Sequence, residues 1–176
     1  MKTKKLIFTA LFTALCCVGT MVIKFPTPLG GYIHVGDAMV VLSGFLLGPL
    51  YGAFAAGVGS ALADAISGYF IYVPATLIIK ALVALIAALL LRGFKSSHIG
   101  FRSILAGAIG GIFMMLGYFA FEAVVLGFGM AAAVDMPTNA LQGAFGAVAA
   151  SVLYISLMRS AYVRQYLSEL RTDGKG

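Results

Sequence analysis

Residues 34–80, HVGDAMVVLSGFLLGPLYGAFAAGVGSALADAISGYFIYVPATLIIK, decide how this chain folds. The stretch is almost uncharged, yet it contains Asp37, Asp64 and Lys80. Insertion of an ionisable residue at the centre of a membrane helix costs about 2.5–3.5 kcal/mol, and such residues usually face a cavity or a partner. The stretch therefore predicts a membrane-embedded fold with a polar site inside it.

The whole chain has the composition of an integral membrane protein. Of its 176 residues, 61% are hydrophobic and 10% are charged, and the mean hydropathy is +1.03, far from the balance of a soluble domain. No charge-rich block is long enough for a soluble domain, so residues 1–176 are expected to form a single integral membrane domain. The basic start MKTKK and the apolar run after it resemble a signal peptide, but further apolar segments follow, and we interpret this region as a retained first span.

Apolar segments separated by helix-breaking residues predict an all-α bundle of six transmembrane helices. A hydrocarbon core about 30 Å thick needs about 20 helical residues, or somewhat fewer in a short buried helix. The predicted spans are residues 6–23, 35–47, 51–67, 74–91, 103–128 and 138–158. Prolines and glycines in KFPTPLGGY, residues 24–32, predict a loop, and Gly48-Pro49 predicts a tight hairpin between the second and third spans.

Basic residues predict the orientation of this bundle, because Lys and Arg in short loops stay on the cytoplasmic side. A six-span arrangement puts on one side Lys2, Lys4, Lys5, Arg92, Lys95, Arg102, Arg159, Arg164, Arg171 and Lys175. Only Lys24 and Lys80 lie toward the other side. We therefore expect a multi-pass protein of the bacterial cell membrane with both termini in the cytoplasm. Topology and anionic lipid explain the net charge of +6 without any nucleic-acid partner.

Polar residues converge at the outer ends of the predicted helices, when each is placed by depth at 1.5 Å per residue. Thr76 and Lys80 share one helix face, as do Tyr118 and Glu122, because each pair is four residues apart. The candidate substrate-binding residues are His34, Asp37, Asp64, Tyr72, Thr76, Lys80, Tyr118, Glu122, Asn139 and Gln142. Together they predict an outward-facing polar pocket.

Each of these residues also has a structural interpretation, which the sequence leaves open. Lys80 can extend to the outer interface, Asp37 and Asp64 can accept hydrogen bonds from loop amides, and a Lys80–Glu122 ion pair can join two helices. The aromatic segment SGYFIYVP, residues 67–74, is typical either of an interfacial belt or of a lid.

The arrangement resembles a known family. The pattern HVGD…LSGFLLGPLYG…GS…AD…SGY…YVPATLIIKAL within residues 34–82, together with ALFTA at residues 10–14 and six spans, is similar to the substrate-binding S components of energy-coupling factor (ECF) transporters. The resemblance is strongest to the branch for riboflavin, hydroxymethylpyrimidine and pyridoxine-like substrates. It implies tight binding of a vitamin, and partnership with a membrane coupling subunit and two cytoplasmic ATPases. It also implies that Ala10 and Ala14 contact the coupling subunit, and that the ligand lies under the first, third and fifth loops.

The charges of the predicted pocket favour a small heteroaromatic ligand with hydroxymethyl groups and ring nitrogens. Tyr72 and Tyr118 are candidates to stack on such a ring, whereas a carboxylate ligand such as pantothenate would pair with Lys80. Our order of expectation is pyridoxine or hydroxymethylpyrimidine, then riboflavin, then pantothenate. No catalytic residue, metal ligand or cofactor is predicted, because the chain contains no HExxH, GxSxG or phosphate-binding GxxxxGK[ST] motif. We therefore do not expect an enzyme.

An alternative function is that of an autonomous proton-coupled secondary transporter of a small metabolite. In that case Asp64 or Glu122 would carry the coupling proton. Such a transporter predicts ionisable residues at mid-depth and an internal inverted repeat, and the sequence shows neither clearly.

Overall fold

Six α-helices make up most of the computed structural model, which describes residues 2–94 and 98–165. The helices are α1 (Lys2–Val22), α2 (Asp37–Leu47), α3 (Pro49–Ile66), α4 (Val73–Gly93), α5 (Ile99–Ala120) and α6 (Met136–Arg159). There are also two short strands, β1 (Lys24–Pro26) and β2 (Tyr32–His34), a π-helix, η1 (Phe121–Val125), and a 3₁₀-helix, η2 (Gly129–Asp135), and residues 161–165 are helical. The predicted all-α class is therefore correct apart from one small hairpin.

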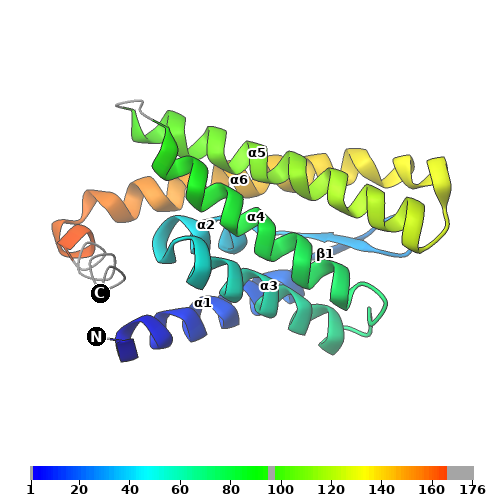
Figure 1. Ribbon diagram of the computed structural model, residues 1–176, viewed down its shortest axis with the longest axis horizontal. Coiled ribbons are helices and arrows are strands. Elements are labelled where there is room, and N and C mark those ends of the chain that lie inside the picture. Colours follow the sequence, from blue (N-terminus) through cyan, green and yellow to red (C-terminus); the bar gives the residue numbers. More distant parts are fainter. Residues whose placement is uncertain (1, 95–97, 166–176) are drawn as a thin grey trace.

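Among the described residues, four helical segments are long and apolar enough to cross a membrane. They are Thr3–Val22, Val73–Gly93, Ile99–Val125 and Gly129–Arg159, and α2 is a shorter apolar helix of 11 residues. The helices lie roughly along one direction and their connections gather at the two ends of the bundle (Figure 1). A count of six spans stays a prediction, because α2 and α3 do not reach the length and hydropathy of the other four.

Helix α2 lies at the centre of the bundle. It contacts α1, α3, α4 and α6, and its residues are buried along almost the whole helix. Small residues allow this close packing: a Cβ added to Gly52 would lie 2.7 Å from the Cα of Gly44, in the hairpin that joins α2 to α3. Gly48 turns that hairpin at a φ of +85°, a conformation that only glycine adopts readily. The predicted Gly48-Pro49 turn is present, with Pro49 in the first turn of α3.

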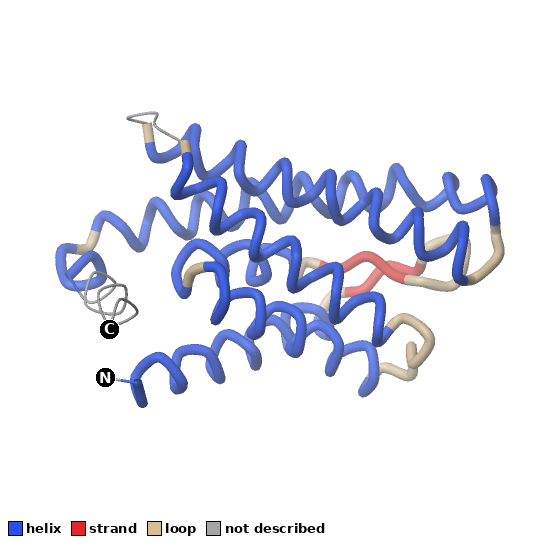
Figure 2. Tube along the Cα trace, viewed as in Figure 1, coloured by secondary structure: helices blue, strands red, loops and turns tan. Residues whose placement is uncertain are grey.

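Residues 24–34 form a β-hairpin where the sequence predicted an irregular loop. Strands β1 and β2 pair antiparallel, and the turn between them is closed by hydrogen bonds from the Thr27 N–H to the Gly31 carbonyl (3.0 Å) and from the Gly30 N–H to the Thr27 carbonyl (3.1 Å). Pro26 is tolerated because it ends a strand at the edge of a two-stranded sheet. The hairpin lies toward the end of the bundle opposite the two termini, with the α3–α4 and α5–α6 connections (Figure 2).

The fifth and sixth helices also differ from the prediction. Instead of one helix over residues 103–128, α5 ends at Ala120 and a π-helical turn follows, in which the Leu126 N–H bonds the Phe121 carbonyl at 3.1 Å. The segment between the fifth and sixth predicted spans, residues 129–137, instead forms η2 and the start of α6. Pro137 suits that first turn because its missing N–H has no partner to lose there.

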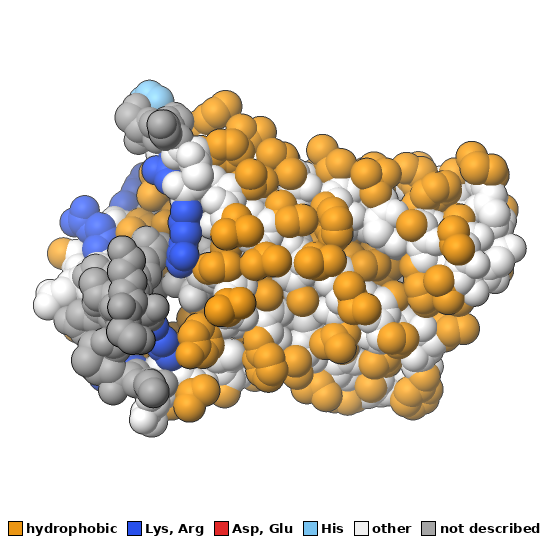
Figure 3. Space-filling view, in the orientation of Figure 1, with side chains coloured by type: hydrophobic (Ala, Val, Ile, Leu, Met, Phe, Trp, Pro, Cys, Tyr) orange, Lys and Arg blue, Asp and Glu red, His pale blue; other side chains and the backbone are white. Residues whose placement is uncertain are grey.

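Lys and Arg side chains gather at the end of the molecule that holds both termini, and hydrophobic side chains cover the flank (Figure 3). Of the residues used to predict orientation, Lys95, Arg171 and Lys175 lie outside the described residues, as does the side chain of Lys2. The basic end and the loop-rich end are therefore opposite ends of the bundle. Which end faces the cytoplasm stays a prediction.

Candidate functional site

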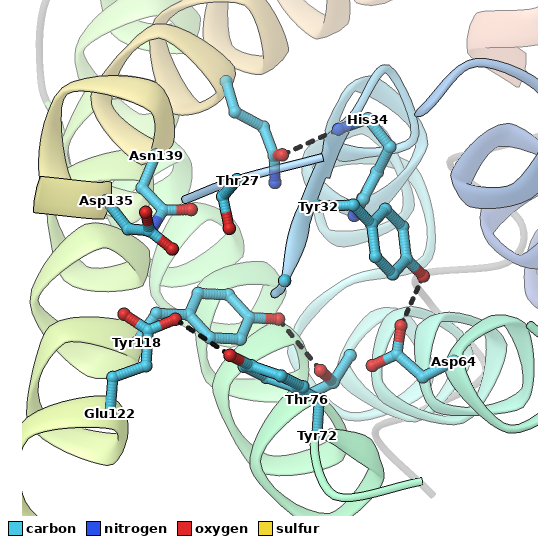
Figure 4. A pocket seen from close by; sticks show the side chains of 12 residues that line it. Thr27, Tyr32, His34, Asp64, Tyr72, Thr76, Tyr118, Glu122, Asp135 and Asn139 are labelled. Atoms are coloured by element: carbon cyan, nitrogen blue, oxygen red, sulfur yellow. Dashed lines mark hydrogen bonds between the residues drawn. The ribbon is translucent and has the colours of Figure 1, made fainter. Parts of the chain in front are cut away.

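A pocket opens at the end of the bundle that carries the hairpin (Figure 4). The space between its lining atoms, including space open to solvent, is about 400 Å³. Its lining comes from the hairpin, α3, the α3–α4 connection, α4, α5, η1, η2 and α6. The lining residues are Thr27, Gly31, Tyr32, His34, Asp64, Tyr72, Thr76, Tyr118, Glu122, Asp135, Asn139 and Gln142.

Most of the predicted substrate-binding residues line this one pocket, although they come from distant parts of the sequence. The two exceptions are Asp37 and Lys80, which lie behind the pocket wall. Contacts between neighbouring helices bring some of these residues together. Thr76 on α4 and Tyr118 on α5, for example, meet through their hydroxyl oxygens at 3.0 Å. The sequence thus identified most of the polar wall without knowing which helices adjoin.

Lys80 and Asp37 form a buried ion pair, with Nζ 2.5 Å from Oδ1. The exposed fraction is 0% for Lys80 and 2% for Asp37, so Lys80 does not reach an interface. Its ammonium also lies 2.9 Å from the Met114 sulfur and 5.4 Å from the centre of the Tyr118 ring. Two of the structural interpretations are therefore wrong: Lys80 neither extends to the membrane surface nor pairs with Glu122.

Gln142 connects this ion pair to the hairpin. Its Nε2 donates a hydrogen bond to Asp37 Oδ2 (2.8 Å), and its Oε1 accepts one from the backbone N–H of His34 (2.8 Å). Both polar ends of the amide are thereby satisfied in a buried position. Gln142 is the pocket-lining residue through which α6 holds both α2 and β2 in register.

His34 is buried and neutral. Burial and the positive charge of Lys80 lower the pKa of His34 to about 3. Its Nδ1 accepts a hydrogen bond from the Gly36 N–H at 3.1 Å, which places the single ring proton on Nε2. His34 therefore presents a neutral imidazole to the site.

One side of the pocket is formed by Tyr32 and Asp64. The Tyr32 hydroxyl donates a hydrogen bond to the Asp64 carboxylate, and burial together with that carboxylate raises the pKa of Tyr32 well above its ordinary value, which keeps the hydroxyl protonated. The Tyr32 ring packs against Tyr69 with ring centres 4.5 Å apart, and Lys24 lies over it at 4.8 Å. This side has a donor for its carboxylate and a cation nearby.

The opposite side of the pocket is formed by Glu122, Asp135, Asn139 and Tyr72 (Figure 4). The Tyr72 hydroxyl donates to Glu122 Oε1 at 3.3 Å. Glu122 Oε2 and both carboxylate oxygens of Asp135 are buried without a hydrogen-bond partner in the described part of the chain. The two sides of the pocket thus differ in how well their carboxylates are satisfied.

The aromatic segment at residues 67–74 has a mixed role that neither prediction anticipated. Tyr72 is buried and lines the pocket, whereas Phe70 and Ile71 are exposed on the outside of the bundle. Tyr72 therefore forms part of the pocket wall, while Phe70 and Ile71 are exposed in the way expected of residues in an interfacial belt.

Four pocket-lining residues were absent from the predicted set: Thr27, Gly31, Tyr32 and Asp135. Tyr32 and His34 share one face of β2 because strand side chains alternate, so recognising the strand would have found Tyr32. Asp135 is the single charged residue in the apolar run MAAAVDMP, residues 130–137, and that isolation was the available signal.

Comparison with known proteins gives the family. The family model described as "ECF-type riboflavin transporter, S component" matches residues 1–159. A protein of Pyrococcus woesei, described as "Uncharacterized protein in gap 3'region", is 43% identical over 117 residues, which cover 66% of this chain and 76% of that protein. The chain accordingly belongs to the family of S components of ECF-type riboflavin transporters, and it is a membrane transport subunit and not an enzyme.

Proposed function

We propose that this chain captures a small water-soluble vitamin or vitamin precursor in the pocket for ATP-driven uptake by partner subunits. The observation that carries the proposal is a pocket lined by aromatic and hydrogen-bonding side chains from nearly every element of a transport subunit. Such a combination of ring surfaces and a few placed polar groups is typical of small-molecule sites. The residues proposed to contact substrate are those that line the pocket, and Asp37 and Lys80 support them from behind.

The proposed orientation places the pocket on the outer side of the cell membrane. Basic side chains gather at the opposite end of the bundle (Figure 3), and Lys and Arg in short loops favour the cytoplasmic side. With six spans, both termini lie in the cytoplasm. A pocket on the outer side suits an importer, because it meets the substrate before transport.

A face of α1 is the proposed contact with a membrane coupling subunit. Ala10 and Ala14 are both exposed on α1 and are one helical turn apart. The other face of α1 packs on α3, where an added Cβ at Gly59 would lie 2.7 Å from the Cβ of Cys16. Small exposed residues at this spacing allow a partner helix to approach closely. Two cytoplasmic ATPases bound to the coupling subunit would supply the energy.

The proposed substrate is a small heteroaromatic vitamin. Tyr32, Tyr72 and Tyr118 supply ring surfaces and hydroxyls, and the pocket lining contains no Lys or Arg among residues 2–94 and 98–165. Pyridoxine or hydroxymethylpyrimidine therefore remains first, followed by riboflavin, the substrate in the family description. Pantothenate is last, because the lysine expected to pair with its carboxylate is already paired with Asp37.

The test is mass spectrometry of small molecules released from the purified protein, followed by calorimetric titration of the identified molecule. Asn139→Ala is expected to weaken binding at least tenfold, because Asn139 lines the pocket. Leu141→Ala, two residues away on the exposed side of α6, is the matched control and is expected to bind normally. Recovery of no small molecule, or proton-driven uptake by the chain alone in vesicles, would contradict the proposal, and the second result would favour the autonomous transporter.

A further inference from the structure

The three carboxylates of the pocket differ in their hydrogen bonding. Asp64 accepts a hydrogen bond from the Tyr32 hydroxyl. Glu122 accepts one bond at Oε1, and its Oε2 has no partner, while neither oxygen of Asp135 has one in the described residues. Glu122 is 3% exposed and Asp135 is 1% exposed, so both carboxylates are buried in the wall of the pocket. A buried carboxylate without donors is unfavourable and calls for a specific explanation.

Asp135 does not have the structural role that its position suggests. It precedes α6 as the N-cap residue, where an aspartate normally accepts a hydrogen bond from a backbone N–H of the first turn. No such side-chain bond is present at this helix. The carboxylate instead lines the pocket, so helix capping does not account for it.

Backbone irregularities bring Glu122 and Asp135 to the same side of the pocket. Glu122 lies in the π-helical turn that follows α5, and such turns occur frequently at functional sites. Asp135 ends the 3₁₀-helix on the next stretch of chain. Figure 4 shows both side chains on the side away from Tyr32 and Asp64.

No cation of the described chain neutralises this pair. Lys80 is bound to Asp37 behind the wall, and Lys24 donates to Ser67 on the other side of the pocket. The described residues also contain no group of three His, Cys, Asp or Glu residues that could hold a metal ion. A positive charge that satisfies both carboxylates would therefore come from the ligand.

We infer that Glu122 and Asp135 together bind an ammonium group that the substrate carries as a substituent. This rests on the proposed function and narrows it, because it selects basic vitamins or precursors over neutral or anionic ones. A charge-assisted hydrogen bond from N⁺–H to a carboxylate is the strong kind and satisfies the oxygens that the protein leaves unpaired. The aromatic side chains of the pocket would hold the ring of the same molecule.

The test uses three probes that share one ring and differ in one substituent. Pyridoxamine carries a protonated aminomethyl group at pH 7, pyridoxine a hydroxymethyl group, and 4-pyridoxate a carboxylate; riboflavin is added as a larger neutral probe. Binding to the purified, ligand-stripped full chain is measured by calorimetry at pH 7. We expect pyridoxamine to bind most tightly and at least tenfold more tightly than 4-pyridoxate. Glu122→Gln and Asp135→Asn are each expected to weaken pyridoxamine binding at least tenfold and to reduce that ratio.

Thermal unfolding without ligand supplies a second measurement and a matched control. Replacing a buried carboxylate that lacks hydrogen-bond donors with an amide should raise the Tm of the unliganded protein in Glu122→Gln and Asp135→Asn. Asp64→Asn also removes a pocket carboxylate, but one that has a donor, and its Tm should fall. This measurement also shows that the variants fold, so that a loss of binding in them has a local cause.

Several outcomes would overturn the inference while leaving the proposed function intact. These are 4-pyridoxate or riboflavin binding as tightly as pyridoxamine, unchanged pyridoxamine affinity in both amide variants, or pyridoxine and pyridoxamine binding equally, which would indicate a proton shared by the two carboxylates. If the molecule retained on purification is none of the probes, the absence of an ammonium group in it also overturns the inference. Failure to retain or bind any small molecule would reject the proposed function as well.

Discussion

Lys80 of α4 and Asp37 of α2 form an ion pair 2.5 Å long inside the bundle, behind the wall of the pocket. Gln142 of α6 donates to the second oxygen of Asp37, so three helices meet at one carboxylate. A buried ion pair is costly to break because the remaining charge has no water around it. The pair therefore supports the pocket, although neither residue lines it.

Replacing Lys80 should destabilise the protein strongly. Lys80→Met fills similar space but leaves the charge of Asp37 unpaired, which is expected to cost about 3–5 kcal/mol of folding free energy. The double variant Lys80→Met with Asp37→Leu removes both charges and should be more stable than Lys80→Met alone. Thermal unfolding in detergent measures both. Equal stability of the single and double variants would contradict a cost of leaving the Asp37 charge unpaired.

Adding a methyl group between α5 and α6 should also destabilise the protein. A Cβ at Gly111 would lie 3.0 Å from the Cα of Gly143, so Gly111→Ala should cost about 1–3 kcal/mol through overpacking. The control is Gly100→Ala, where the nearest atom to an added Cβ is a flexible end of Ile155 at 3.5 Å. There the substitution should be neutral or stabilising, because alanine favours helix over glycine. Unfolding curves of the two variants that coincide would contradict the close contact.

Stability should fall in acid partly because of His34, which lies outside the four candidate spans. Its pKa is lowered by burial to about 3 in the folded protein, against an ordinary value of 6.5. The unfolded chain therefore takes up a proton first as the pH falls. The contribution of neutral His34 is complete above pH 6.5 and is lost progressively between pH 6.5 and about 3.

The measurement is the difference in Tm between the wild type and His34→Gln across that pH range. Glutamine keeps an oxygen that can accept from Gly36 but does not titrate. The wild type should lose stability relative to the variant as the pH falls. Since carboxylates titrate in both proteins, only the difference between them reports on His34. A constant difference would show that His34 is not held neutral by the fold.

Loss of the Tyr32 hydroxyl should weaken both the fold and the site. Tyr32→Phe leaves the carboxylate of Asp64 without this donor, which is expected to cost about 1–3 kcal/mol. Tyr69→Phe is the matched control, because its ring packs against Tyr32 but its hydroxyl does not bond Asp64. Thermal unfolding and ligand titration should both separate the two variants. Equal effects would mean that ring packing, and not the hydrogen bond, holds this side of the pocket.

Larger residues on the exposed face of α1 should block assembly but not folding. Ala10→Leu with Ala14→Leu adds bulk where we propose that a coupling subunit docks, and both positions are exposed. The variant should unfold at the wild-type temperature and bind ligand normally, yet fail to co-purify with the coupling subunit and ATPases. Ala140→Leu, on the exposed side of α6, is the control and should assemble. Normal assembly of the α1 variant would place the contact elsewhere.

Local chemistry made much of this fold predictable. Apolar runs of helical length between prolines and glycines indicated the positions of the helices, and the turn at Gly48 was evident because Gly-Pro ends one helix and begins the next. The rise of 1.5 Å per residue then placed polar side chains at a common depth. For that reason residues as distant as His34 and Gln142 were predicted to share one pocket.

Partners across helices were not predictable in this way. The sequence suggested Glu122 as the partner of Lys80, and only the contact of α4 with α2 shows that the partner is Asp37. Local sequence patterns also did not predict the hairpin at residues 24–34. Its strands have three residues each, which is too short to show a clear alternation of polar and apolar side chains. Asp135 lines the pocket from the end of a 3₁₀-helix, and the sequence pattern does not predict that helix.

The sequence by itself determined a membrane-embedded helical chain with polar groups at one end, because helix formation and burial in lipid depend on local composition and period. Only the tertiary structure decided which charges neutralise one another and which stay unpaired, because that depends on the rotation and neighbours of each helix. It joins Lys80 to Asp37 and Tyr32 to Asp64. It leaves Glu122 and Asp135 with unsatisfied oxygens facing the pocket, the feature from which the chemistry of the ligand was inferred.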